Sequence, residues 1–167
     1  MRVVAAESPA QTVLCAELAR RIWEEFYTPI IGAEQVAYML RTFQSAEAIA
    51  AQSSEGYRYY LLYDDDTPVG YCAAVAEADV LKVSKLYVLQ RCRGGGGGRM
   101  MLTQCERTAA EAGLKRLRLT VNRHNLSVGF YERVGFVRTG TQVTPIGGGF
   151  VMDDYVMERP VPFHGSE

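Results

Sequence analysis

Apolar residues recur every three or four positions in the first third of the chain, which is the spacing of amphipathic helices. The segment Ser8-Pro9-Ala10-Gln11 has the form of a capping box with proline in the first turn. We therefore predict that the first helix begins there and ends near Tyr27-Thr28-Pro29, with an apolar face made of Leu14, Leu18, Ile22 and Phe26. A second helix is predicted over residues 33–43, and a third follows Ser45, which can cap it.

Runs rich in β-branched and aromatic residues follow, and these are typical of strands. Residues 57–63 and 69–75 flank the turn-forming segment Asp64-Asp65-Asp66-Thr67-Pro68, which predicts a hairpin. Residues 83–89 and 115–121 predict two more strands, and the second has a buried face of Leu117, Leu119 and Val121.

A last pair of strands is predicted over residues 136–143 and 150–157, joined through Pro145 and the glycines at 147–149. Pro160 and Pro162 should end the ordered chain, so we expect a frayed tail after about residue 159 that includes His164–Glu167. Helices first, then antiparallel strands around a strand-loop-helix unit, predict an α/β (α+β) domain with a mixed, mostly antiparallel sheet.

Five consecutive glycines separate the strand at 83–89 from a helical pattern that Gly113 ends. Glycine permits positive φ and removes every Cβ, so successive backbone N–H groups can converge on one anion, and a helix N-terminus adds its own free N–H groups. Arg93 and Arg99 bracket the run with permanent charge, which suits a phosphate. The alternative is a flexible linker, but a linker does not sit between a strand and the helix that follows it.

Two common phosphate loops do not fit. A dinucleotide fingerprint needs a third glycine where Arg99, Met100 or Met101 stands, and a nucleotide P-loop needs Gly-Lys-Ser/Thr where Gly98, Arg99 and Met100 stand. Arg93-x-x-Gly96-x-Gly98 instead resembles the R/Q-x-x-G-x-G/A signature of the GNAT superfamily of acyl-CoA-dependent N-acetyltransferases. The resemblance implies acetyl-CoA as co-substrate and a cofactor site made of Leu86, Tyr87, Val88, Arg93, Gly94, Gly95, Gly96, Gly97, Gly98 and Arg99.

A second motif supports the resemblance. Residues 122–136, NRHNLSVGFYERVGF, are similar to the N…A…FYEK-GF segment that closes the cofactor site in that superfamily, although the stretch between Asn125 and Tyr131 is one residue shorter. By the resemblance, Asn125 contacts the pantetheine arm, and Tyr131 lies near the thioester sulfur and protonates the departing thiolate. Structural alternatives remain: Asn125 is also a good N-cap for a helix over 126–134 that Gly135 ends, and Tyr131 also suits an apolar core.

Composition argues against several other classes of protein. A chain of 167 residues with 48% hydrophobic residues is expected to form a single domain, residues 1–167. A net charge of −1 gives no case for nucleic acid, and no apolar run is long enough for a membrane span. Cys15, Cys72, Cys92 and Cys105 are scattered and only two histidines are present, so we expect a reduced, cytoplasmic protein with no metal site.

The resemblance extends over nearly the whole chain and implies the GNAT fold, with a sheet flanked by helices. IWEEFYTPIIGAEQVAYMLRTFQS, SKLYVL and GGGFVMDDYVME are similar to segments of the bacterial branch that includes diamine and spermidine/spermine N-acetyltransferases. The expected activity is transfer of acetyl from acetyl-CoA directly to a primary amine, with a backbone N–H of the strand carrying Tyr87 and Val88 meeting the oxyanion.

The expected acceptor is a polyamine or another small amine; a peptide or protein amine, and a non-catalytic acyl-CoA sensor, are the alternatives. A polyamine needs carboxylates, and Asp153 and Asp154 are the candidates, with Glu24 and Glu25 behind them. Strand alternation sends Asp153 and Asp154 to opposite faces, so at most one should enter the site, and a purely structural role for both is the competing interpretation. The sequence leaves open whether the protein forms a homodimer.

Overall fold

The computed structural model describes residues 1–162, so the predicted frayed tail at His164–Glu167 lies outside the described residues. Seven strands within that range form one sheet in the order β1-β2-β3-β4-β5-β7-β6. The strands are β1 (Arg2–Ala5), β2 (Arg58–Asp64), β3 (Thr67–Glu77), β4 (Val80–Val88), β5 (Arg116–Asn122), β6 (Val137–Gly147) and β7 (Phe150–Pro160). Among these described strands, all neighbours are antiparallel except β4 and β5, which confirms the predicted mixed, mostly antiparallel sheet.

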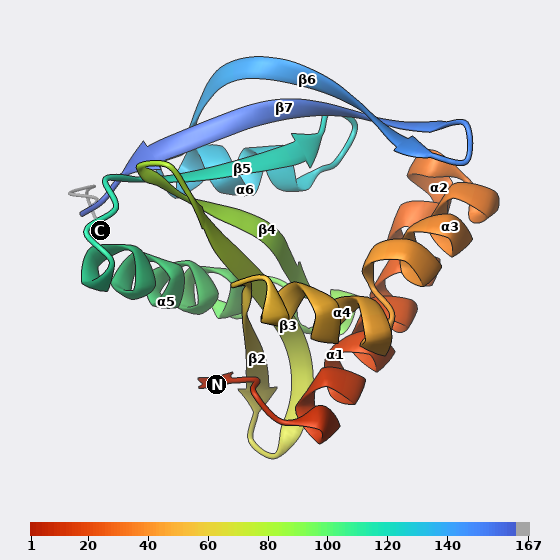
Figure 1. Cartoon of the computed structure of the whole chain (residues 1–167), viewed down its shortest axis with the longest axis horizontal. Helices are drawn as coiled ribbons and strands as arrows, with labels where there is room; N and C mark the ends of the chain where they lie inside the picture. The colour runs from red at the N-terminus through yellow and green to blue at the C-terminus, as the bar shows by residue number, and fades with distance from the viewer. Residues whose placement is uncertain (163–167) are drawn as a thin grey trace.

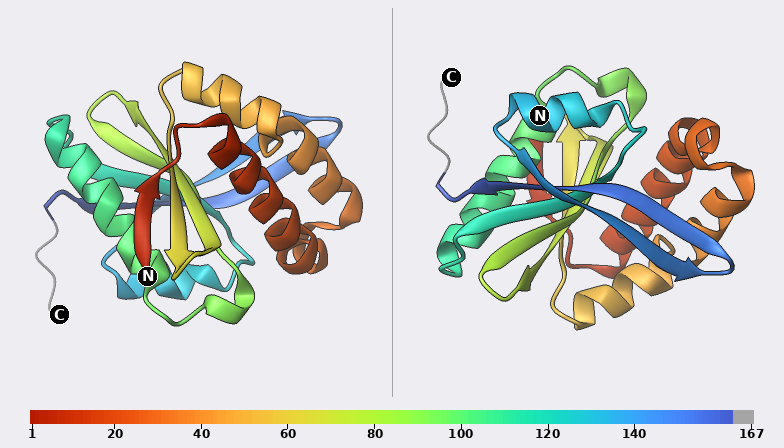
Figure 2. Two further views of the ribbon diagram at one scale, coloured as in Figure 1. Left: turned by 90° about the horizontal axis from the view of Figure 1, so that it is seen from below. Right: turned by 90° about the horizontal axis from the view of Figure 1, so that it is seen from above.

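Helices cover both faces of the sheet (Figures 1 and 2). One group packs on one face and comprises α1 (Pro9–Ile22), the π-helical turn η1 (Trp23–Tyr27), α2 (Thr28–Ile31), α3 (Ala33–Phe43) and α4 (Ala46–Ser54). The opposite face is covered by α5 (Gly97–Glu111) and α6 (Ser127–Arg133), with the short 3-10 turn η2 (Gln90–Cys92) before the glycines. Within the described range, no helix has the length and apolar character needed to cross a bilayer.

The helix starts follow the predicted caps. Ser8 Oγ accepts a hydrogen bond from Gln11 N, and the Gln11 side chain accepts one from Ser8 N, which completes the capping box. Ser45 Oγ accepts a hydrogen bond from Ala48 N at the start of α4, and α3 has the predicted bounds. Local hydrogen-bond chemistry therefore sets these helix starts.

The first helix differs from its prediction at the C-terminal end. Its last turn is π-helical, with one extra residue per turn, and it buries Trp23 and Tyr27, whereas Phe26 stays partly exposed. A steady spacing of four predicted Phe26 on the apolar face, and the ring does pack against the core, although only partly buried. Trp23 and Tyr27 are the more deeply buried rings, and Tyr87 of β4 packs edge-on against both.

Three further differences lie in the strands. β1 was not predicted, because it is only four residues long and lies at the edge of the sheet, where it pairs with β2. Pro68 and Pro145 lie inside strands rather than in the connections, each beside a register shift that accommodates its missing N–H. β7 runs to Pro160, three residues beyond the predicted end, because its last residues pair with the start of β5.

Candidate functional site

The candidate site lies where β4 and β5 separate. Their parallel pairing runs only from Val80–Arg116 to Lys82–Arg118, after which β5 stays paired with β7 and β4 stays paired with β3. Two cavities open in and beside this gap, which we call the inner pocket and the glycine groove. They meet at four residues that line both of them: Leu86, Arg93, Ser127 and Tyr131.

The glycine groove is formed by backbone at the start of α5. Gly94 and Gly96 have φ of 83° and 87°, a conformation that L side chains rarely adopt, and Gly96 is the N-cap of α5. A Cβ on Gly97 would lie 2.5 Å from Leu62 Cδ2, so only glycine lets the helix start pack this closely on the sheet. No side chain of residues 1–162 caps α5, which leaves its first N–H groups available to an anion.

The charge of the groove is positive. Its charged lining, within the described range, consists of Arg93, Arg99 and Arg133, and no carboxylate lines it. Arg93 also stacks on the Phe26 ring, with its Cζ atom 4.0 Å from the ring centroid. Three guanidinium groups around free helix N–H groups suit a group with several phosphates, because each can donate two hydrogen bonds to phosphate oxygens.

Most residues predicted for the cofactor site line the groove, and three do not. Leu86, Val88, Arg93, Arg99 and four of the glycines line it. Gly95 instead packs near Met1, where a Cβ would lie 3.1 Å from Met1 Cε. Tyr87 and Asn125 line the inner pocket.

Asn125 is held by two hydrogen bonds. Its Oδ1 accepts one from Ser127 N at 2.8 Å, and its Nδ2 donates one to Tyr27 Oη at 3.0 Å. The side chain is buried, and the second bond joins two parts of the chain that are 98 residues apart. The N-cap interpretation of Asn125 is wrong, because Leu126 is the N-cap of α6 and no side chain of the described residues caps this helix. The bond to Ser127 N instead stabilises the turn before α6, and the amide holds the Tyr27 ring in the pocket wall.

Tyr131 lies where the two cavities meet. Its ring packs against Phe130 and Phe136, as the core interpretation predicted, and it also lines both cavities. Burial raises the pKa of Tyr131 well above its usual value, and the nearby Tyr27 hydroxyl adds to the shift. The phenol is therefore protonated at neutral pH and can act as a donor at the junction.

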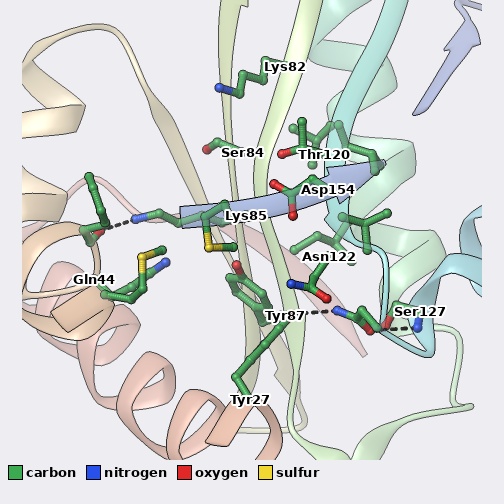
Figure 3. Close-up of a pocket in the computed structure, with 18 of the residues that line it drawn as sticks. Tyr27, Gln44, Lys82, Ser84, Lys85, Tyr87, Thr120, Asn122, Ser127 and Asp154 are labelled. Carbon is green, nitrogen blue, oxygen red and sulfur yellow. Dashed lines mark hydrogen bonds between the residues drawn. The ribbon is translucent and has the colours of Figure 1, made fainter. Parts of the chain in front are cut away.

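Aromatic rings form one wall of the inner pocket (Figure 3). The rings of Trp23 and Tyr27 stack with centroids 4.3 Å apart, and Tyr87 meets both edge-on. The π-helical turn places Trp23 and Tyr27 together on this wall. Burial raises the pKa of Tyr27 to about 12, so this hydroxyl is also neutral.

Asp154 is the carboxylate of the inner pocket. It pairs with Asn122 across β5 and β7, is 5% exposed, and its Oδ1 has no hydrogen-bond partner among the described residues. Burial raises the pKa of Asp154 to about 6, the neighbouring Asp153 charge adds to the shift, and Arg123 opposes it. Asp153 points away and forms an ion pair with Arg123 at 2.8 Å, so strand alternation places these two residues as predicted. Glu24 and Glu25 are exposed on η1 and do not line the pocket.

Two lysines of β4 also line the inner pocket, Lys82 and Lys85. A β-bulge at Ser84 explains why side chains on both sides of it reach the same space, because Val83 pairs with Ala74 and Lys85 with Ala73. Lys85 is buried, and its Nζ donates to Phe43 O, Gln52 Oε1 and Tyr59 Oη at 2.6, 3.1 and 2.6 Å. Burial lowers the pKa of Lys85 to about 7.

Four residues of the site were missed in the sequence: Tyr27, Lys82, Lys85 and Arg133. Arg133 carried a usable signal, because it lies three positions after Phe130 on the same predicted helix, and residues at that spacing share a helix face. Lys82 and Lys85 are three positions apart, and in a regular strand that spacing would put them on opposite faces. Only the bulge brings them together.

Two parallel strands separate here, beside a helix whose N-terminus follows a run of glycines. This arrangement is that of an acetyltransferase domain. The family model described as acetyltransferase (GNAT) domain matches residues 27–154, so the chain belongs to the GNAT acetyltransferase family. The matched range includes the glycine loop, Tyr131 and Asp154.

Similar proteins agree with this assignment. Uncharacterized N-acetyltransferases of Mycobacterium tuberculosis and Mycobacterium bovis are 29% identical over 147 residues, which is 86% of this chain and 94% of theirs. The PaiA N-acetyltransferase of Thermoplasma acidophilum, solved with coenzyme A, has a TM-score of 0.77 at 23% identity, covering 96% of this chain and 99% of that one. A GCN5-related N-acetyltransferase structure from Rhodopseudomonas palustris has a TM-score of 0.80 at 17% identity and covers 95% and 94% of the two chains. These two structures show the shared fold.

Proposed function

We propose that this protein transfers the acetyl group of acetyl-CoA directly to the primary amine of a small molecule. The observation that carries the proposal is the position of Tyr131 at the junction of a cationic groove and a separate pocket with one buried carboxylate. A two-substrate reaction without a covalent enzyme intermediate needs such a junction, because both substrates must be present at once.

The residues of the glycine groove fit acetyl-CoA. The free N–H groups at the start of α5 and the three arginines would hold its pyrophosphate, and Leu86 and Val88 of β4 would lie beside its pantetheine arm. The structure of PaiA in complex with coenzyme A is a precedent in the same fold. The cofactor supplies an activated thioester when it is bound.

Tyr131 and Asp154 would handle the two protons of the reaction. An amine attacks only in its neutral form, and Asp154, with a pKa of about 6, can take up a proton from an ammonium group near neutral pH. Tyr131 holds its proton and can donate it to the thiolate that leaves. A cysteine nucleophile is not part of the proposal, because Cys15, Cys72 and Cys105 are buried and Cys92 lines the glycine groove but not the inner pocket.

The acceptor is proposed to be a small amine. The resemblance to diamine and spermidine/spermine acetyltransferases remains a prediction, and an aminoglycoside 6'-N-acetyltransferase solved with coenzyme A shares the fold with a TM-score of 0.69 at 18% identity. These folds serve different acceptors, so the acceptor must be inferred from the side chains of the inner pocket.

The test combines binding and turnover. Acetyl-CoA should raise the melting temperature, because a ligand that binds the native state stabilises it, and coenzyme A should be released when primary amines are added. Tyr131→Phe keeps the ring and should lower kcat by ~10²-fold with little change in acetyl-CoA affinity. Tyr63→Phe, on β2 outside both cavities, is the matched control.

Each failure has a distinct meaning. A melting temperature that stays constant in millimolar acetyl-CoA would contradict the cofactor assignment. Acetyl-CoA binding without coenzyme A release for any amine would indicate an acyl-CoA sensor. Full turnover in Tyr131→Phe would mean that another group protonates the thiolate.

A further inference from the structure

The charges that line the inner pocket do not suit an acceptor with several positive charges. Among the described residues, the charged lining consists of one carboxylate, Asp154, and of three basic side chains, Lys82, Lys85 and Arg93, of which Arg93 lies at the junction with the glycine groove. A polyamine bound there would have one carboxylate to pair with and several basic side chains to avoid. Like charges brought together in a partly desolvated pocket oppose binding.

Lys82 and Asp154 occupy different levels of the pocket. In the sheet register, Lys82 of β4 lies opposite Arg118 of β5, which is the last paired position before these strands separate. Asp154 of β7 lies opposite Asn122 of β5. These two positions on β5 are four residues apart, which is about 13 Å at the usual rise of a strand. Figure 3 shows the same order: Lys82 and Ser84 lie at one end, Tyr27 and Ser127 at the other, and Asp154 between them.

Asp154 is suited to bind an ammonium group. Its Oδ1 is buried without a hydrogen-bond partner among the described residues. A buried carboxylate without a partner lowers the free energy of unfolding, and a ligand that donates hydrogen bonds to it removes this cost. It also lies within electrostatic reach of Tyr27 and Tyr87, since its charge raises the pKa of both hydroxyls. Those rings belong to the wall that continues to Tyr131 and the groove.

The two lysines differ in what they can do. Lys85 donates to Phe43, Gln52 and Tyr59, so its side chain is held in the wall and is not free to turn to a ligand. Lys82 Nζ lies 3.8 Å from Glu77 Oε1, at the outer limit of an ion pair, and a third of its side chain is exposed. Lys82 can therefore turn to an anion in the pocket at little cost.

We propose that the acceptor is a small amine that also carries a carboxylate, with its ammonium group on Asp154 and its carboxylate on Lys82. This inference rests on the proposed acetyl transfer and specifies its acceptor. The inner pocket then pairs both ends of a zwitterion. A polyamine would satisfy only the Asp154 end.

Three amines with the same five-carbon chain provide the test: 5-aminopentanoate, pentylamine and 1,5-diaminopentane. They differ only in the far group, which is negative, uncharged or positive. We expect kcat/KM for 5-aminopentanoate to exceed the values for the other two at least tenfold, with acetyl-CoA saturating. Equal or better use of pentylamine or 1,5-diaminopentane would overturn the inference.

A charge reversal assigns the preference to a residue. Lys82→Glu should lower kcat/KM for 5-aminopentanoate at least tenfold, raise it for 1,5-diaminopentane and leave acetyl-CoA affinity unchanged. Lys115→Glu is the matched control, because Lys115 is exposed before β5 and lines neither cavity. An unchanged preference in a folded Lys82→Glu protein would overturn the role of Lys82.

Calorimetric binding separates this inference from the proposed function. If 5-aminopentanoate binds the coenzyme A complex more tightly than pentylamine but no coenzyme A is released from acetyl-CoA, the charge arrangement is correct and the acetyl transfer is wrong. If pentylamine is acetylated as well as 5-aminopentanoate, the transfer is correct and the inference is wrong. If neither amine binds or reacts, both are wrong.

Discussion

At the scale of single residues, Asp154 destabilises the fold while serving the proposed reaction. The native state keeps this carboxylate buried, and its pKa is about 6 instead of the ordinary 3.8. A native pKa above the unfolded one means that the native state binds the proton more tightly. Ionised Asp154 therefore lowers the free energy of unfolding above pH 6, and this cost disappears below pH 3.8.

Asp154→Asn should therefore stabilise the protein and inactivate it. At pH 7 we expect the free energy of unfolding to rise by about 1–3 kcal/mol, because two pKa units correspond to roughly 2.7 kcal/mol. The gain should shrink as the pH falls from 6 to 4, and kcat/KM should drop by ~10²-fold or more. Urea denaturation over this pH range and steady-state kinetics measure both.

Asp153→Asn is the control for this prediction, since Asp153 points away from the pocket and forms an ion pair with Arg123. It should leave kcat/KM nearly unchanged. Equal loss of activity in the two variants, or destabilisation by Asp154→Asn at pH 7, would contradict the role given to Asp154.

The sequence predicted residues whose role depends on local chemistry. Four of the five glycines and Arg93 line the groove, and the sequence could indicate them because backbone conformation and neighbouring charge are local properties. Tyr27 and Lys85 could not be predicted, because their roles depend on contacts with residues 98 and 42 positions away. Asn125 was predicted as the N-cap of α6, but the cap is Leu126, and the bond from Asn125 to Tyr27 could not be predicted.

At the scale of elements, the two ends of α5 allow a controlled comparison. Gly96 precedes the helix with φ of 87° and Gly113 follows it with φ of 71°, and at neither position would a Cβ meet another atom within 4 Å. The backbone strain of a substitution should therefore be alike at both ends, while only Gly96 faces the groove.

Gly96→Ala and Gly113→Ala should each lower the free energy of unfolding by about 1 kcal/mol, because alanine disfavours this backbone conformation. Only Gly96→Ala should also weaken acetyl-CoA binding, by something like ~10-fold, because its Cβ would project into the groove. Thermal denaturation with and without acetyl-CoA separates the two effects. A similar loss of acetyl-CoA binding in Gly113→Ala would mean that the change acts through the stability of α5.

Lys85 joins three elements at the wall of the inner pocket, since its Nζ donates to the C-terminal carbonyl of α3, to α4 and to β2. Its native pKa of about 7 is below the ordinary 10.5. The unfolded chain therefore binds more protons between these values, so the free energy of unfolding rises with pH in this window.

Lys85→Met should remove that rise. Between pH 7.5 and 8.5, the free energy of unfolding of the wild type should gain up to about 1.4 kcal/mol relative to the variant. Below pH 7 the two curves should run parallel, because Lys85 is then protonated in both states. Chemical denaturation at half-unit pH intervals measures the difference, and parallel curves above pH 7.5 would contradict the lowered pKa.

Helix caps and strand alternation were sufficient to predict most elements, because both follow from a few neighbouring residues. The π-helical turn and the bulge at Ser84 were not predictable in this way. Each of them adds one residue to a regular element, and the side chains that pack against it are distant in the sequence. Its position therefore cannot be predicted from neighbouring residues.

At the scale of the whole molecule, the tip of the hairpin formed by β6 and β7 lies beside α2 and α3 (Figure 1). Tyr38 Oη of α3 donates to Ile146 O at 2.7 Å, and Gln35 Nε2 donates to Val151 O at 2.9 Å. Ile146 and Met152 of the same hairpin line the pocket. α3 and the β6–β7 hairpin, which are distant in the sequence, thus form one wall of the inner pocket together.

Tyr38→Phe should loosen this contact without touching either substrate. Loss of a hydrogen bond of about 1 kcal/mol predicts a KM for the amine about fivefold higher, with the Kd for acetyl-CoA unchanged. Steady-state kinetics and calorimetry give the two values. A change in acetyl-CoA affinity instead of the amine KM would show that the hairpin acts on the groove.

The order of elements was enough to predict the architecture, since alternating helices and strands around one parallel step leave few possible sheets. The separation of β4 and β5 beyond Lys82 could not be read from the sequence. The residues that line the gap come from distant parts of the chain, among them η1, α6 and β7.

The absence of side chains at Gly94–Gly98 has an evolutionary consequence. In the proposed function, the cofactor is held largely by main-chain amides, which most substitutions elsewhere leave intact, whereas the choice of acceptor rests on a few side chains of β4, β7 and η1. Selection can therefore alter the acceptor by single replacements at Lys82 or Asp154 while the donor half is inherited unchanged. This separation allows descendants of one ancestral gene to acquire new acceptors without first losing the ability to bind the acetyl donor.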